Sequence, residues 1–175
     1  MRLFVLLSMF PALALAAPLD VQVTTDGWVE GETEVAVSPE VALRFLSDPR
    51  NVVAAEGRGT TMTVNPNGRC AQVLAVVPTP LGDMTYESRR CALNDGYRAT
   101  LVRSEDFLAY EQEWTIVETP TGVRLRCAVK HQLSIPLPAS FREAFTRRAV
   151  QRLLRTVGPA IAASDAKPEG SLASR

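Results

Sequence analysis

Four side chains that could orient a small molecule alternate along two apolar segments late in the sequence. Tyr110, Gln112 and Trp114 occupy every second position of one segment, and His131 lies in the next. If the intervening turn closes an antiparallel hairpin, Tyr110 faces His131. Gln112 then faces Val129. An apolar wall interrupted by a phenol, an amide and an imidazole is typical of a pocket that orients a small molecule.

The polarity of the two faces of this hairpin supports its register. The same pairing sets Leu108 against Leu133 on the apolar face. On the opposite face it pairs Glu111 with Lys130, which is typical of a solvated surface. A slip of one residue would mix the two sets of side chains, because successive residues of a strand face opposite sides.

The apolar face needs a partner, and a long C-terminal helix is the candidate. Residues 139–163 have the periodicity of an amphipathic helix, with arginines mostly outside its apolar stripe. We therefore predict a ligand-binding set drawn from the hairpin and this helix: Tyr110, Gln112, Trp114, Val129, His131, Phe141, Phe145 and Leu153.

The pair of His131 and Tyr110 has two interpretations. In an enzyme, His131 would be a general base and Tyr110 a hydrogen-bond donor. In a structural role, the two would form a hydrogen-bonded pair in the core. The chain contains a single histidine and no clustered metal ligands, nucleophile elbow, P-loop or dinucleotide fingerprint. No metal and no cofactor are therefore expected.

The three cysteines predict one disulfide. Cys70 and Cys91 lie on two strand-like segments joined by a turn rich in proline and glycine. If Val77 faces Met84 across that turn, Cys70 falls directly opposite Cys91, where a bridge can form. Cys127 would remain a buried thiol. The alternative is that Cys70 and Cys91 are reduced structural cysteines.

Residues 1–16 have the pattern of a secretory signal peptide. Arg2 precedes an apolar run over 3–10, and a small-residue stretch ends in Ala14-Leu15-Ala16. We expect cleavage after Ala16 and a periplasmic or secreted protein with no membrane-spanning segment after cleavage. An uncleaved N-terminal anchor is the alternative.

Composition indicates one ordinary globular domain. The chain has 175 residues, of which 46% are hydrophobic and 22% charged, and 19 basic residues balance 19 acidic ones. This balance gives no support to a nucleic-acid partner.

Most of the chain has the pattern of short strands joined by tight turns. A strand is expected at 29–37, followed by a short helix that begins at Ser38-Pro39-Glu40 and ends at Asp48-Pro49. Consecutive hairpins then predict an antiparallel meander. The predicted strands of the meander are 57–65, 69–77, 84–93, 97–104, 107–118 and 122–135.

This order of elements resembles the START-like, or SRPBCC, superfamily. The best local match is the segment 37–49, which is similar to the strand-to-helix entry common in these proteins. The resemblance implies an α+β helix-grip fold (START/Bet v-like), in which a seven-stranded antiparallel sheet wraps around the long C-terminal helix. It implies three regions: a signal peptide at 1–16, the START-like domain at 17–164 and a disordered tail at 165–175.

The resemblance also implies a hydrophobic cavity between sheet and helix, but it does not identify the ligand. We expect an exported domain that binds a lipid, an isoprenoid or a similar small hydrophobic molecule, without catalysis. The alternative is a cyclase or dehydratase that acts on a polyketide-like or steroid-like substrate through His131 and Tyr110. A structural or partner-binding domain with a filled core is a third possibility. The sequence does not indicate the oligomeric state.

Overall fold

A computed structural model describes residues 19–56, 61–79 and 82–166. The predicted signal peptide and all but the first two residues of the predicted tail lie outside these ranges. The elements follow one another in the order β1 (Val21–Val23), β2 (Val29–Val35), α1 (Pro39–Ser47), α2 (Pro49–Glu56), β3 (Thr61–Asn67), β4 (Cys70–Thr79), β5 (Gly82–Ala92), β6 (Gly96–Ser104), β7 (Phe107–Thr119), β8 (Gly122–Leu133) and α3 (Ala139–Asp165).

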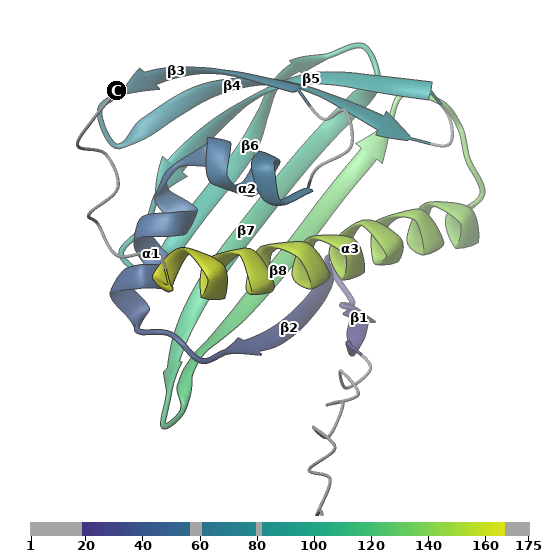
Figure 1. Cartoon of the computed structure of the whole chain (residues 1–175). Helices are drawn as coiled ribbons and strands as arrows, with labels where there is room; N and C mark the ends of the chain where they lie inside the picture. The colour runs from purple at the N-terminus through teal and green to yellow at the C-terminus, as the bar shows by residue number, and fades with distance from the viewer. Residues whose placement is uncertain (1–18, 57–60, 80–81, 167–175) are drawn as a thin grey trace, which may run out of the picture.

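The strands form one antiparallel sheet in the order β1-β2-β8-β7-β6-β5-β4-β3 (Figure 1). The sheet has eight strands instead of the predicted seven, because Val21–Val23 pairs with β2 as a short edge strand. The six strands from β3 to β8 follow the chain in an unbroken meander, as the turn residues predicted. The first long strand, β2, then pairs with the last one, β8.

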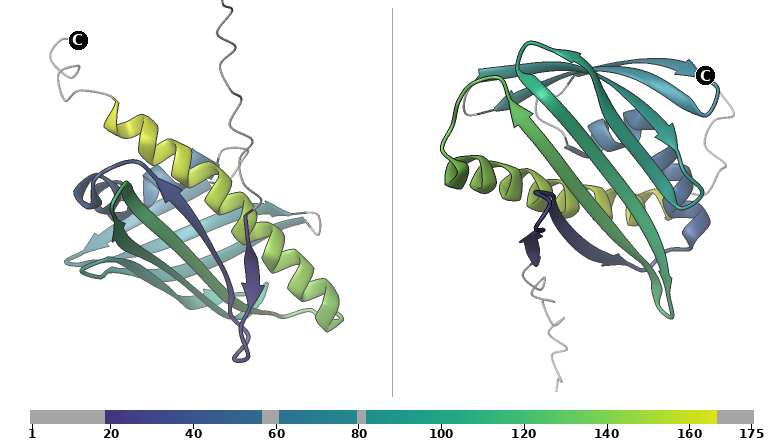
Figure 2. Two further views of the ribbon diagram at one scale, coloured as in Figure 1. Left: turned by 90° about the horizontal axis from the view of Figure 1, so that it is seen from below. Right: turned by 180° about the vertical axis from the view of Figure 1, so that it is seen from behind.

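All three helices lie on the concave side of the curved sheet (Figures 1 and 2). Helix α1 begins where Ser-Pro-Glu predicted: the Ser38 side chain accepts a hydrogen bond from the Val41 amide, and Pro39 occupies the first turn. Asp48 ends α1, and α2 begins directly at Pro49. Helix α3 packs mainly against β2 and β8, while β3, β4 and β5 arch away from it.

The predicted registers of two hairpins are confirmed, with one correction. Cys70 lies opposite Cys91 and forms a disulfide with it. In the last hairpin Tyr110 faces His131, as expected, but Leu133 pairs with Phe107 and not with Leu108. A register shift between Phe107 and Ala109 turns Phe107 inward and leaves Leu108 62% exposed.

Two clusters of apolar side chains fill the concave face. The larger one joins the sheet to the helices and includes the fully buried Trp114, Leu125 and Leu154. The smaller one is centred on Met84, Phe107 and Leu133. The interior of the described residues also contains four buried polar side chains, and these matter for the site: Ser88, Arg90, Gln112 and Thr146.

No helix in the described part of the chain combines the length and hydrophobicity that crossing a bilayer requires. The predicted signal peptide is not among these residues.

Candidate ligand-binding site

Three of the predicted site residues lie deep in the larger cluster. Trp114 has no exposed surface, and Val129 and Leu153 are 4% and 8% exposed. The indole Nε1 of Trp114 has no hydrogen-bond partner among the described residues. These side chains therefore form the packed floor between β7, β8 and α3.

His131 and Tyr110 belong to a group of aromatic rings. The Tyr110 ring lies 4.8 Å from that of Tyr86 between centroids. The imidazole of His131 meets Phe107 and Phe145 edge-on, at 5.7 and 5.8 Å. The hairpin and α3 thus bring together three of the predicted residues, Tyr110, His131 and Phe145.

The surroundings of His131 do not favour the cyclase or dehydratase alternative. Its Nε2 atom lies 3.4 Å from the hydroxyl of Thr146. Burial lowers the pKa of His131 to about 4, and the positive charge of Arg142 acts in the same direction. The imidazole is therefore neutral at pH 7 and a weaker base than a free histidine.

Gln112 satisfies its buried amide through a residue that was not predicted. The hydroxyl of Tyr97 donates a hydrogen bond of 3.2 Å to Oε1 of Gln112. Tyr97 is 1% exposed and lies on the neighbouring strand, β6. Phe141, by contrast, lies in the first turn of α3, one turn before Phe145, and is 46% exposed.

A pocket of about 410 Å³ opens beside the predicted set, at the corner where α1 meets α2. The β3–β4 hairpin and the C-terminal half of β5 form its other walls. Apolar parts of the wall come from Val64, Pro66, Ala71 and Ala92. Among the lining residues Pro49, Arg90 and Tyr97 are buried, and Arg90 and Tyr97 are the two with polar side chains. The pocket has the size of a small-molecule site and reaches one of the four buried polar side chains of the concave face, Arg90.

Arg90 is the most unusual residue of this pocket. Only 7% of it is exposed, and its guanidinium lies over the Tyr97 ring, 3.3 Å from the ring centroid. Its Nη2 donates a 2.7 Å hydrogen bond to the carbonyl oxygen of Leu46, near the end of α1. Burial lowers the pKa of Arg90, but an arginine remains charged at physiological pH.

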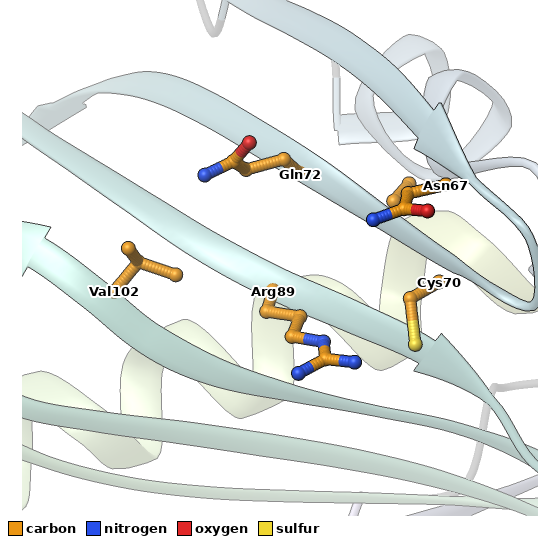
Figure 3. A pocket seen from close by; sticks show the side chains of 6 residues that line it. Asn67, Cys70, Gln72, Arg89 and Val102 are labelled. Carbon is orange, nitrogen blue, oxygen red and sulfur yellow. The ribbon is translucent and has the colours of Figure 1, made fainter.

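A second, smaller pocket lies on the convex face of the sheet. It has a volume of about 240 Å³ and includes Gln72 and Arg89, which face each other across β4 and β5 (Figure 3). Arg89 is exposed and follows Ser88, which is buried. The alternation along β5 therefore places Arg89 and Arg90 on opposite faces of one strand.

The sequence analysis did not identify Arg90 or Tyr97, although their positions carried a signal. The predicted pairing of Cys70 with Cys91 puts Arg90 on the face opposite the disulfide. Carrying that register through β6 to Gln112 would have placed Arg90 and Tyr97 on the same face as the predicted set.

Comparison with solved structures decides the fold. A START superfamily protein from Mycobacterium smegmatis superposes with a TM-score of 0.66 and 20% identity, over 77% of this chain and 96% of that one. This chain has the START-like, or SRPBCC, fold. No protein-family model and no curated protein matches the sequence, so the structural likeness carries this conclusion.

Other START-like structures of similar likeness differ in what they do. The Zhui aromatase/cyclase from Streptomyces sp. R1128 superposes with a TM-score of 0.65 at 14% identity, covering 82% of this chain and 97% of that one. The human StAR-related lipid transfer protein 5 gives a TM-score of 0.60 at 15% identity, covering 82% and 80%. At such identities the likeness establishes the START-like fold alone.

Proposed function

We propose that this protein binds a small hydrophobic molecule on the concave side of its sheet and does not transform it. The pocket of about 410 Å³ beside α1 and α2 carries this proposal. Its volume falls within the range of about 300 to 1,000 Å³ found for ligand sites, and it combines apolar walls with a few polar anchors. Similar folds in a lipid transfer protein and an aromatase/cyclase are consistent with such a cavity.

Native mass spectrometry of the protein purified from its own host tests this proposal. We expect an adduct that organic extraction removes and that small-molecule analysis identifies as apolar. The variant Val64→Trp places an indole in the pocket wall and should lower adduct occupancy at least about tenfold, since the volume is then filled. Thr63→Trp is the matched control, because Thr63 is exposed on the same edge strand. Equal occupancy in both variants, or no adduct in the wild type, would contradict the proposal.

We further propose that the protein acts outside the cytoplasm. The pattern of residues 1–16 and the Cys70–Cys91 disulfide both support this, since disulfides persist mainly in oxidising compartments. Fractionation of the host with N-terminal sequencing tests it. The mature protein is expected in the periplasm or the medium, with Ala17 as its first residue. A cytoplasmic protein that retains Met1 would contradict it.

A further inference from the structure

Arg90 is a buried cation without a carboxylate partner in the described part of the chain. A guanidinium has five N–H donors, and within the described residues one of them is used, toward the carbonyl of Leu46. The Tyr97 ring covers one face of the group. A buried charge is costly unless an opposite charge or further hydrogen bonds accompany it. A bound group that offers hydrogen-bond acceptors to the remaining N–H donors would therefore be stabilised here.

The nearest acidic residue of the pocket is already engaged. Asp48 accepts hydrogen bonds from both Nε and Nη2 of Arg50, at 2.9 Å each, and from the Arg50 amide. Its ion pair is with Arg50, while its charge also acts on Arg90 and opposes the lowering of that guanidinium's pKa by burial. Among the described residues the lining contains three arginines, Arg50, Arg69 and Arg90, and a single acidic residue, so this part of the pocket has an excess of positive charge.

The other walls of the pocket provide contacts for hydrocarbon. Val64 and Pro66 come from the edge strand β3, Ala71 from its neighbour β4, and Ala92 from the next strand, β5. Arg90 lies opposite Ala71 across β4 and β5, beside this apolar surface, and Arg69 and Arg50 belong to the exposed part of the lining. A ligand that matches this pattern has one anionic group and an apolar chain.

We propose that the pocket binds an amphiphile whose oxyanion head, a carboxylate or a phosphate, pairs with the guanidinium of Arg90 while its hydrocarbon lies against β3 and β4. The planar fork of an arginine matches two oxygens of either anion, which makes the contact directional as well as charged. This inference rests on the proposed function and adds to it the chemical class of the ligand head.

Three probes with the same tail test the proposal: octanoate, octyl phosphate and octanol. Affinities come from NMR titrations of ¹⁵N-labelled protein, with each probe kept below its micelle-forming concentration. We expect octanoate, octyl phosphate or both to bind at least about tenfold more tightly than octanol, because a charge-assisted pair replaces a neutral contact. The stronger of the two anions identifies the head as carboxylate or phosphate. Shifts should include the amides of Arg90 and Leu46.

Variants of Arg90 and of its neighbour test whether Arg90 causes the preference for anionic probes over octanol. Arg90→Met should bring the affinity for the anions to within about threefold of that for octanol. Arg89→Met is the matched control, since Arg89 is the preceding residue of β5 and faces the convex side. It should retain the wild-type preference. Arg90→Lys keeps the charge without the fork and should retain part of the preference, which covers the case in which Arg90→Met does not fold.

The outcomes separate this inference from the proposed function. Equal affinities for all three probes in the wild type would overturn the oxyanion head and leave hydrophobic binding intact. An anion preference that survives in Arg90→Met would overturn the role of Arg90. Acetate and inorganic phosphate are titrated as controls that lack the octyl tail. If either binds as tightly as the octyl anions, the site takes small free anions, and the proposal of an amphiphilic ligand is overturned. No binding of any octyl probe would overturn both proposals.

Discussion

The guanidinium of Arg90 lies 3.3 Å from the centre of the Tyr97 ring, and both side chains are more than nine-tenths buried. The hydroxyl of Tyr97 also donates a hydrogen bond to Gln112 on the adjacent strand. The ring supports the cation on one side, and the hydroxyl satisfies a buried amide on the other. This single tyrosine therefore connects the pocket with the residues that the sequence predicted.

Replacing Tyr97 should separate these two contributions. Tyr97→Phe removes only the hydroxyl and should lower the free energy of unfolding by about 1 kcal/mol, since Gln112 loses one hydrogen bond. Tyr97→Leu also removes the ring under Arg90 and leaves a cavity, and should cost about 3 kcal/mol or more. Urea unfolding followed by circular dichroism measures both values. Equal losses in the two variants would show that the ring does not support Arg90.

The start of β6 should tolerate no side chain at Gly96. A Cβ atom there would overlap the carbonyl oxygen of Trp114, which is part of the backbone and cannot move aside alone. Gly96→Ala should therefore cost about 3 kcal/mol or more, in the range of severe core changes. Gly68 is the control: its φ is 62° but nothing lies near its Cβ position, so Gly68→Ala should cost only about 1 to 2 kcal/mol. Thermal and urea unfolding compare the two, and the reverse order would contradict the packing of β6 on β7.

The disulfide should contribute measurably to stability. Cys70 and Cys91 are 21 residues apart, and closing a loop of this length is worth about 3 kcal/mol in the chain-entropy model. Urea midpoints with and without dithiothreitol measure the effect. The Cys70→Ser/Cys91→Ser double variant should be insensitive to the reductant. If dithiothreitol lowers the urea midpoint of the double variant as much as that of the wild type, the effect does not come from the disulfide and the prediction is contradicted.

Thiol counting should distinguish Cys127 from the other two cysteines. Cys127 is buried with no exposed surface and is not part of a disulfide. We expect no thiol that reacts rapidly with Ellman's reagent in the native protein, one after unfolding, and three after unfolding and reduction. A fast-reacting thiol in the native state would mean that Cys127 is accessible or that the disulfide is open.

The only histidine of the chain should titrate far below its ordinary range. Burial and Arg142 lower the pKa of His131 from 6.5 to about 4. The unfolded state therefore takes up the proton first, so stability is full above pH 6.5 and falls as the pH drops toward 4. The loss should approach about 1.4 kcal/mol per pH unit within this window. NMR of the single imidazole gives the folded pKa directly.

A variant isolates this effect from the titration of carboxylates. The stability of His131→Gln should depend less on pH between 6.5 and 4.5 than that of the wild type, by about 2 to 3 kcal/mol over the interval. A folded pKa near 6.5, or parallel pH profiles for the two proteins, would contradict the buried position of His131.

Much of the fold could be predicted from the sequence, because turns, strand periodicity and helix caps depend on neighbouring residues alone. Tight turns and a side-chain period of two fix the register of a hairpin, and this is why the facing pairs Cys70–Cys91 and Tyr110–His131 were predictable. The start of α1 was predictable for a similar reason, because Ser38 caps the first turn with its own side chain.

The sequence did not predict features that depend on which of several similar residues packs inward, or on pairing with a distant strand. Phe107 and Leu108 are both apolar, so the sequence alone did not indicate which of them the bulge turns inward. Strand β1 is only three residues long and has no pattern of its own; pairing with β2 defines it.

The position of the pocket depends on the curvature of the sheet. The strands β3 to β5 arch away from α3, and this three-dimensional relation has no counterpart in sequence periodicity (Figure 1). Arg90 was missed for a further reason: arginine is seldom fully buried, so its inward position followed only from a register carried across three strands.

The disulfide also restrains the strand that carries Arg90. Arg90 is followed directly by Cys91, and adjacent residues of a strand face opposite sides. The covalent bond to Cys70 therefore restrains the backbone that carries the guanidinium. In a reducing environment this restraint would be lost, and fluctuations of β4 against β5 would move the cation relative to the carbonyl of Leu46. We therefore expect the oxidation state of these two sulfur atoms to affect the position of the charged group on the other side of β5.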